Sequence, residues 1–358
     1  MKKFIGVLKE KNIGAGYLYF YIHFITEVVC FYLLFKIRGN SYLLWMIPLL
    51  YDALAFVPQS IFGYFSDKHP KINLALIGVV LLTISMPIYF LFHTPYLAIV
   101  ILCIGNALLH VEGAEVTLRS SNGKMASPAI FVGGGSFGVV TGKLLAATTV
   151  NYLLIVFFSL TMIPFILLAD YYKKDTLKDK NPCKNFNYHN KNMNTKLVVL
   201  FAVLIVFVRA YMGYGIPTSW NKTTLETILL FSFMGVGKCL GGIMVDLIGM
   251  RKTAILSIAC SLPFLLFGDH IMIISLFGIL LFSMTMAITL GLIVSVLKSK
   301  PGLAFGFTTI GLFLGTAPTF FYAVYDNKIN ILIVSIATLI CIPLLMYTIR
   351  KDEKHGTN

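Results

Sequence analysis

The sequence predicts an all-α polytopic membrane protein whose twelve transmembrane helices form two pseudo-symmetric six-helix bundles. The mean hydropathy is +0.84, and 58% of the 358 residues are hydrophobic against 12% charged, which is too apolar for a soluble domain. Apolar segments follow one another along nearly the whole chain and are interrupted by one long polar stretch near its middle. Short motifs on one side of this stretch recur on the other side.

Each apolar segment holds roughly 20 residues, the length that a helix needs to cross a hydrocarbon core of about 30 Å. Before the polar stretch, the predicted helices cover residues 13–37, 42–66, 73–92, 95–118, 126–148 and 150–169. After it, they cover residues 197–216, 224–247, 253–268, 270–297, 301–323 and 329–349. The opening MKKFIGVLKEKN leads into the first helix without a small-residue cleavage site, so we expect no cleaved signal peptide.

The polar stretch DYYKKDTLKDKNPCKNFNYHNKNMNTK is rich in asparagine and lysine and contains a proline, as linkers do. We therefore predict an N-terminal six-helix bundle at 1–170, a cytoplasmic linker at 171–196 and a C-terminal six-helix bundle at 197–358.

The formal net charge is +14 at pH 7, and the placement of the basic residues explains it. An even number of helices puts both termini on one side of the membrane, and most loop lysines and arginines fall on that side. The other side receives only Lys36, Arg38, Lys222 and Lys328. This asymmetry predicts cytoplasmic termini and a location in a bacterial inner membrane. The basic excess is thus an orientation signal, and we expect no nucleic-acid binding.

The six cysteines are scattered, and none forms a pair with metal-ligand spacing. We interpret them as small apolar residues and expect no disulfide framework, no metal site and no cofactor. The expected partners are the lipid bilayer, a small-molecule substrate and protons, and we expect a monomer.

A short motif follows the second predicted helix and recurs after the eighth. The two copies, FGYFSDKHPK and GGIMVDLIGMRK, contain Gly63, Asp67, Lys71, Gly242, Asp246, Gly249 and Arg251. A second pattern, one proline followed by two glycines, has the same spacing at Pro128, Gly138 and Gly142 and at Pro301, Gly311 and Gly315. These matches indicate an internal duplication, which is common in secondary transporters.

The aspartates of the motif, Asp67 and Asp246, are predicted to lie at the cytoplasmic ends of their helices. A small residue one turn earlier lets two helices approach closely. There the carboxylate can hold an arginine or the positive N-terminal end of a neighbouring helix in one state and release it in another. The alternative is a simple helix end with basic side chains that reach the interface. Two copies at matching places favour gating.

This motif resembles the loop motif of the major facilitator superfamily, and the plan of six plus six helices is similar to that superfamily over the whole chain. The segments YIHFITEVVCF, VPQSIFGYFSD and GNALLHVEGAE, followed by FVGGGSFGVVTGK, resemble the fosmidomycin-resistance branch. Pro70 stands where the superfamily usually has glycine, and Val111 and Lys143 stand where the branch has proline. The resemblance implies transport by alternating access along a path lined by helices 1, 2, 4, 5, 7, 8, 10 and 11.

Polar side chains interrupt several of these helices near their midpoints, where a charge costs at least about 2.5 kcal/mol. They are His23, Glu27, Asp52, Gln59, Asn106, His110, Arg209 and Lys238. His23 and Glu27 are four residues apart and therefore share a helix face. In the neighbouring stretch HVEGAEVTLR, Glu115 and Arg119 are predicted to form an interfacial ion pair near Asp67.

Acids and histidines cluster in the first half of the chain, whereas buried cations mark the second half. Because buried carboxylates and histidines can titrate near neutral pH, we assign proton coupling to Glu27, His23, Asp52, His110 and Glu112. We assign substrate binding to Arg209, Lys238, Asn106, Gln59, Tyr211 and Tyr214. The alternative for these side chains is a structural hydrogen bond or ion pair between helices.

The function predicted from these features is proton-coupled export, by antiport, of a small anionic or polar organic compound or drug. A facilitator or a proton symporter that imports a small metabolite is the alternative within the same fold. A membrane enzyme or sensor finds no support, because the sequence has no metal-spaced cluster, nucleotide loop or extramembrane domain.

Overall fold

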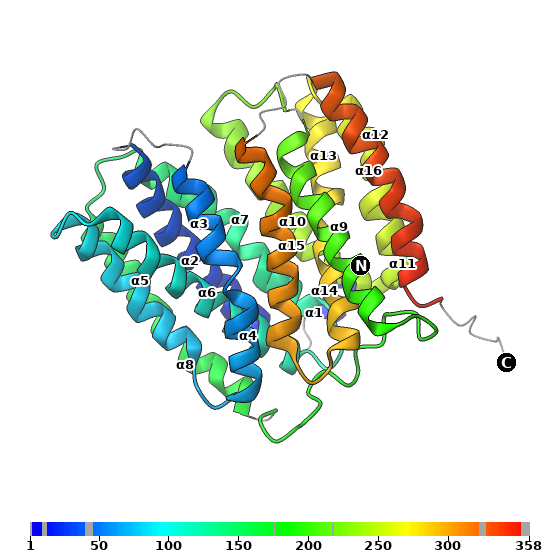
Figure 1. Cartoon of the computed structure of the whole chain (residues 1–358), viewed down its shortest axis with the longest axis horizontal. Helices are drawn as coiled ribbons and strands as arrows, with labels where there is room; N and C mark the ends of the chain where they lie inside the picture. Colours follow the sequence, from blue (N-terminus) through cyan, green and yellow to red (C-terminus); the bar gives the residue numbers. More distant parts are fainter. Residues whose placement is uncertain are drawn as a thin grey trace.

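The computed structural model describes residues 2–8, 13–39, 46–174, 176–216, 218–321 and 327–351. The first residues of the second predicted helix, 42–45, lie outside these ranges, and so does the side chain of Tyr214 within its helix. Two groups of helices stand side by side, one from the N-terminal half of the chain and one from the C-terminal half (Figure 1).

The helices of the N-terminal half lead up to the linker. They are α1 (Lys2–Leu8), α2 (Gly14–Gly39), α3 (Met46–Phe56), α4 (Gln59–Lys68), α5 (Leu74–Phe90), α6 (Pro95–Ser120), α7 (Ala126–Ala146) and α8 (Tyr152–Lys174). α8 runs past the boundary predicted at residue 170, so the first residues assigned to the linker are helical.

The C-terminal half follows the linker. It comprises α9 (Thr195–Gly215), α10 (Thr224–Ile248), α11 (Met250–Ala254), the π-helical segment η2 (Ile255–Ala259), α12 (Ser261–Phe267), α13 (Met272–Ser283), α14 (Thr285–Val296), α15 (Pro301–Phe321) and α16 (Asn327–Thr348).

The helices agree with the predicted count. Eleven spans in the described residues are long and apolar enough to cross a membrane, and the shorter apolar helix Leu74–Phe90 corresponds to the third of the twelve predicted helices. The span Met46–Lys68 is divided between α3 and α4, because Pro58 cannot donate a backbone hydrogen bond at the junction. Asp52 and Gln59, both in the second predicted helix, therefore lie on either side of this break.

The proline–glycine pattern packs in the same way in both halves. Gly138 on α7 faces the carbonyl of Phe24 on α2, and Gly315 on α15 faces the carbonyl of Phe207 on α9. A Cβ atom at either glycine would collide with that backbone, so only glycine permits the close approach. The internal duplication predicted from the sequence is thus visible as two equivalent helix pairs, α2 with α7 and α9 with α15.

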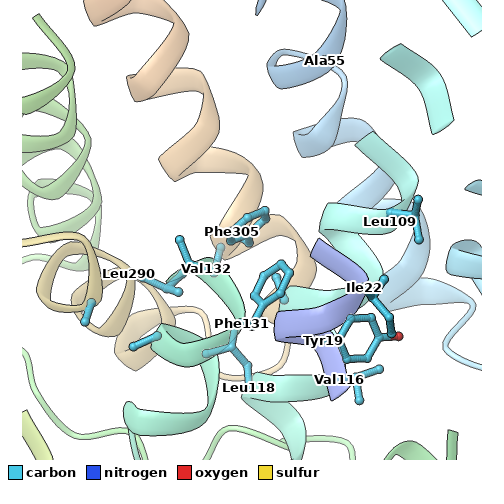
Figure 2. Packing of buried hydrophobic residues seen from close by; sticks show 14 of the residues in the cluster. Tyr19, Ile22, Ala55, Leu109, Val116, Leu118, Phe131, Val132, Leu290 and Phe305 are labelled. Atoms are coloured by element: carbon cyan, nitrogen blue, oxygen red, sulfur yellow. The ribbon is translucent and has the colours of Figure 1, made fainter. Parts of the chain in front are cut away.

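Buried aromatic side chains join the two halves. Phe131 of α7 lies between Tyr19 of α2 and Phe305 of α15, with ring centroids 6.0 and 6.1 Å away (Figure 2). Because α15 belongs to the C-terminal half, the core is continuous across the boundary between the bundles at this level.

The linker binds both halves at one end of the molecule. The Tyr188 hydroxyl donates to the carbonyl of Gly123 between α6 and α7 at 2.7 Å, and the backbone N–H of Asn190 donates to the carbonyl of Thr348 at 2.8 Å. The Lys298 ammonium donates to the side chain of Asn187 at 2.6 Å. We call this end of the molecule the linker end; it is the lower end in Figure 1.

Candidate functional site

Asp67 and Asp246 each hold the first turn of a helix in the opposite half. Asp67 accepts hydrogen bonds from the backbone N–H groups of Gly302 and Leu303, both at 2.9 Å, at the start of α15. Asp246 accepts from the N–H groups of Met125 and Ala126, both at 2.8 Å, at the start of α7. We call these contacts the Asp67 latch and the Asp246 latch. The free N–H groups and the dipole of a helix N-terminus favour a carboxylate there.

The glycine one turn before each aspartate makes its latch possible. A Cβ atom at Gly63 would collide with the backbone of Gly302, and one at Gly242 would collide with the carbonyl of Met125. The loop after the second latch also needs glycine, because Gly249 ends α10 at φ 87°. The motif residues thus meet at the linker end, where they clamp the two halves together.

A second group of charges lies beside the Asp67 latch, on α6. The Arg119 side chain donates to Glu115 at 2.6 Å, and Ser66, next to Asp67, also donates to Glu115. The ion pair predicted near Asp67 is therefore present. Glu112 contacts the Lys173 ammonium at 2.6 Å and accepts from the backbone N–H of Leu74 at 3.1 Å. Glu112 is thus tied to α8 and to the first turn of α5.

His23, Glu27 and His110 come together inside the N-terminal half. The Nε2 atoms of the two histidines are 2.8 Å apart. Glu27 Oε1 lies 3.3 Å from His110 Nε2 and 3.7 Å from His23 Nε2, and these three side chains are about 8% exposed. We call this group the histidine–glutamate triad. The sequence paired His23 with Glu27 along one helix, but the contact with His110 is an interhelical one.

Asn106 connects the triad to α3. Its side-chain amide lies 3.3 Å from Glu27 Oε1 and 3.1 Å from the Tyr51 hydroxyl, and it also contacts Cys30. Tyr51 was not among the predicted site residues, because an apolar helix with one more tyrosine gives no sequence signal. The amide thus donates to the same Glu27 oxygen, Oε1, that lies near both histidines.

The triad has the donor set of a metal site. One ligand atom from each of its three residues lies within 4.8 Å of the others. The Nδ1 atoms of His23 and His110 lie 2.9 Å from the carbonyls of Phe131 and Asn106, as they do in metal-ligating histidines. The triad could therefore hold a metal ion or a proton.

Lys238 brings a cation from the C-terminal half to the triad. Its ammonium donates to Ser136 of α7 at 2.9 Å and is within electrostatic range of Glu27 and both histidines. Glycine again allows the approach, because a Cβ atom at Gly135 would collide with the ring of His23. The Gly-rich run of α7 thus lets His23 pack closely against α7, which Lys238 also contacts through Ser136.

Three other predicted site residues contact groups outside the triad. Arg209 lines a small cavity within the C-terminal half, together with Phe282 and Thr285, and its Nε has no hydrogen-bond partner among the described residues. Asp52 lies at the boundary of the halves, where Thr316 of α15 donates to it at 3.4 Å. Gln59 donates to the carbonyl of Ala55 at 2.8 Å and is fully buried.

Tyr211 and Tyr214 of α9 were also predicted to bind the substrate. Tyr211 is partly buried, and the side chain of Tyr214 lies outside the described residues. Lys71, after the Asp67 latch, is exposed, and Arg251, after the Asp246 latch, is partly buried.

Comparisons with known proteins support the architecture. No protein-family profile and no curated protein matches the sequence. The structure is similar to the crystal structure of the human organic anion transporter MFSD10 (TETRAN), with a TM-score of 0.64 and 12% sequence identity over 94% of this chain and 100% of that one. The chain therefore shares the fold of that transporter, in agreement with the predicted all-α plan of two helical bundles.

Proposed function

We propose that this protein is a secondary transporter of the major facilitator superfamily that moves a small organic anion across a membrane by alternating access. The observation that carries this proposal is the pair of Asp67 and Asp246 latches. They bind the two halves to each other at the linker end, and among the described residues no contact of this kind joins the halves at the other end. Two bundles that rock about a central site need contacts which can form and break at an end.

The latches define one state of the proposed cycle. With the linker end in the cytoplasm, as the lysine distribution predicts, both latches hold the cytoplasmic side closed. Opening that side removes the helix N-termini from the carboxylates, which water can then solvate. The latches therefore stabilise one state by a modest free energy and do not lock it.

The proposed substrate class follows from the cations of the C-terminal half. Lys238 reaches α7 and faces the triad, and Arg209 lacks a partner for its Nε among the described residues. Burying such cations is costly unless an anion joins them. The similar human protein is an organic anion transporter, which agrees with this assignment.

We further propose that transport is coupled to protons and directed outward. The titratable groups of the triad lie within electrostatic range of Lys238, so a change of charge on one side alters binding on the other. Asp52, beside α15, is a second acid at the boundary of the halves. A facilitator with the same fold would not need either group.

Reconstituted proteoliposomes test the function directly. We expect uptake of a labelled organic anion from a panel of carboxylates, phosphonates and sulfonates, and we expect a proton gradient to drive accumulation. Lys238→Gln should abolish this accumulation of the anion. The matched control Lys222→Gln, at an exposed loop position, should not. Equilibration without accumulation would favour a facilitator, and no flux of any anion would reject the proposed substrate class.

A further inference from the structure

The two histidines of the triad face each other through the same ring atom. Nδ1 of His23 lies 2.9 Å from the carbonyl oxygen of Phe131, and Nδ1 of His110 lies 2.9 Å from the carbonyl oxygen of Asn106. A carbonyl oxygen only accepts hydrogen bonds, so each Nδ1 must carry the hydrogen. In a neutral imidazole the other nitrogen is then an acceptor, and both Nε2 atoms present lone pairs.

Both Nε2 atoms lie close to a third acceptor, and the two ring planes are inclined at 79°. The Nε2 atoms are 2.8 Å apart, a normal hydrogen-bond distance, and Glu27 Oε1 is 3.3 Å from one of them. With both rings neutral and the carboxylate ionised, three acceptors converge with no hydrogen between them. Acceptors held this close repel one another, so the geometry requires a positive centre.

We propose that His23 and His110 bind a single proton between their Nε2 atoms, with Glu27 as its counter-ion. The proposal rests on the proposed function only in taking this proton as the coupling ion. One proton converts the repulsion into an N–H···N hydrogen bond. A second proton on the same line would set two N–H groups against each other, so the pair holds one.

The surroundings fit a monovalent charge. Asn106 donates to Glu27 and Tyr51 contacts the same amide, while Cys30 lies beside it. Lys238, from α10, and Asp52, from α3, are the charged residues within electrostatic range of Glu27 among those described. The bound proton and Glu27 together are neutral, so the site tolerates Lys238 nearby. A divalent ion would leave a net positive charge next to that ammonium.

The spacing also separates a proton from a metal. Two nitrogens that each lie about 2.0–2.1 Å from a tetrahedral zinc ion are roughly 3.3 Å apart. The Nε2 atoms here are 2.8 Å apart, the distance of a hydrogen bond through one shared proton. The inference commits to the proton, and metal binding becomes an outcome of the test.

Nuclear magnetic resonance of the full chain, labelled with 15N-histidine, in lipid nanodiscs tests the site without any substrate. We expect one strongly deshielded proton that correlates with the Nε2 atoms of two different rings. His23→Gln and His110→Gln should each remove this signal completely. His93→Gln, at an exposed histidine in the loop between α5 and α6, should leave it unchanged. Glu27→Gln should keep the pairing and lower the pH at which the signal is lost.

Two results would overturn the inference. One is the absence, across the pH range, of any proton that correlates with the Nε2 atoms of two rings in the folded wild-type protein. This observation needs no variant. The other is stoichiometric binding of added Zn²⁺ by chelator-treated protein, lost in His23→Gln and His110→Gln. The assay is independent of transport. A shared proton without anion flux would reject the proposed function alone, whereas flux without a shared proton would reject this site alone.

Discussion

Asp67 on α4 and Asp246 on α10 make the same contact from opposite halves of the molecule. Each carboxylate accepts two successive backbone N–H groups at the start of a helix in the other half. A glycine one turn earlier removes the Cβ atom that would keep those backbones apart. The halves are therefore joined at the linker end by two equivalent contacts, and neither includes a residue of the triad.

Replacing one aspartate should weaken its latch and leave the substrate site intact. In Asp246→Asn the charge and one acceptor oxygen are lost, and hydrogen bonds to charged groups are worth about 1.5–3 kcal/mol. We expect a roughly tenfold or greater shift towards the state that is open at the linker end. Transport should slow, while ligand affinity should change little. The equivalent variant Asp67→Asn tests the other latch. In it, the distance between spin labels attached at Lys71→Cys and Lys300→Cys should lengthen for the same reason.

Asp179→Asn serves as the control for these variants. Asp179 is in the linker, where hydrogen bonds from the backbone of Asn181 and from Lys184 lower the pKa of its carboxyl. It contacts no helix N-terminus among the described residues, so this variant should keep the wild-type distances. A large loss of ligand affinity in Asp246→Asn would contradict a purely gating role.

A methyl group at Gly242 should act on the same contact from the other side. In Gly242→Ala the new Cβ atom would meet the carbonyl of Met125, so α10 must move away from α7. Gly213→Ala in α9 is the matched control, because its Cβ atom would meet nothing within 4 Å. We expect cysteines placed at the linker end to react faster with a thiol reagent in Gly242→Ala than in the wild-type protein. Gly213→Ala should leave this rate unchanged. Equal labelling of both variants would count against the role of this glycine.

The sequence predicted the latches and the triad only in part. Gly63 and Asp67 repeat at Gly242 and Asp246, and this spacing predicted the glycine and the aspartate of each latch, whereas the partner helix in the opposite half was not predicted. His23 and Glu27 were likewise readable from their separation of four residues. The meeting of His23 with His110 depends on how α2 and α6 cross, which spacing within either helix does not encode.

Other features escaped the sequence for local reasons. Lys173 was counted with the linker, because α8 was expected to end earlier, and its pairing with Glu112 was therefore missed. The break before α4 could have been read from Pro58, which cannot continue a helix. The position of Arg209 inside one bundle follows from the rotation of α9, and helix rotation is set by packing.

The pair of Glu112 and Lys173 offers a stability test. Both side chains are nearly fully buried, at 0% and 5% exposure, with the ammonium 2.6 Å from the carboxylate. In Lys173→Met the buried Glu112 carboxylate keeps the hydrogen bond from Leu74 but loses its counter-ion, which should destabilise the protein by about 3–5 kcal/mol. The double variant with Glu112→Gln removes both charges and should recover much of this loss. Thermal unfolding of the purified variants measures the effect, and equal stability of single and double variants would contradict it.

The predicted orientation can be tested at Lys184 in the linker. A cysteine at this exposed position should be hidden from impermeant thiol reagents in intact cells and should react after permeabilisation. The neighbouring Cys183 will not obscure the result, because burial raises the pKa of its thiol to about 12. A cysteine at Lys222, on the opposite side in the predicted topology, should label in intact cells. The reverse pattern would invert the topology.

Lys238 decides whether the substrate is an anion. Its ammonium is held by Ser136 of α7, within electrostatic range of the triad, so it is placed to bind a negative group that enters between the halves. Lys238→Gln keeps a hydrogen-bond donor and removes the charge. A charged hydrogen bond is worth about 1.5–3 kcal/mol, so we expect affinity for organic anions to fall roughly 10- to 100-fold. The affinity of this variant for neutral analogues of the same compounds should fall only slightly.

Ligand binding to purified protein, measured for an anion and its neutral amide, separates charge recognition from misfolding. If both ligands weaken equally, Lys238 supports the structure of α10 and not the substrate. Arg209→Gln provides the complementary comparison, because Arg209 lines a cavity within one half and its Nε is unpaired among the described residues. A loss of anion affinity in Lys238→Gln but not in Arg209→Gln would place the substrate's negative group beside α7. The triad would then lie within electrostatic range of that group, and the charge of the shared proton would act on the substrate through space.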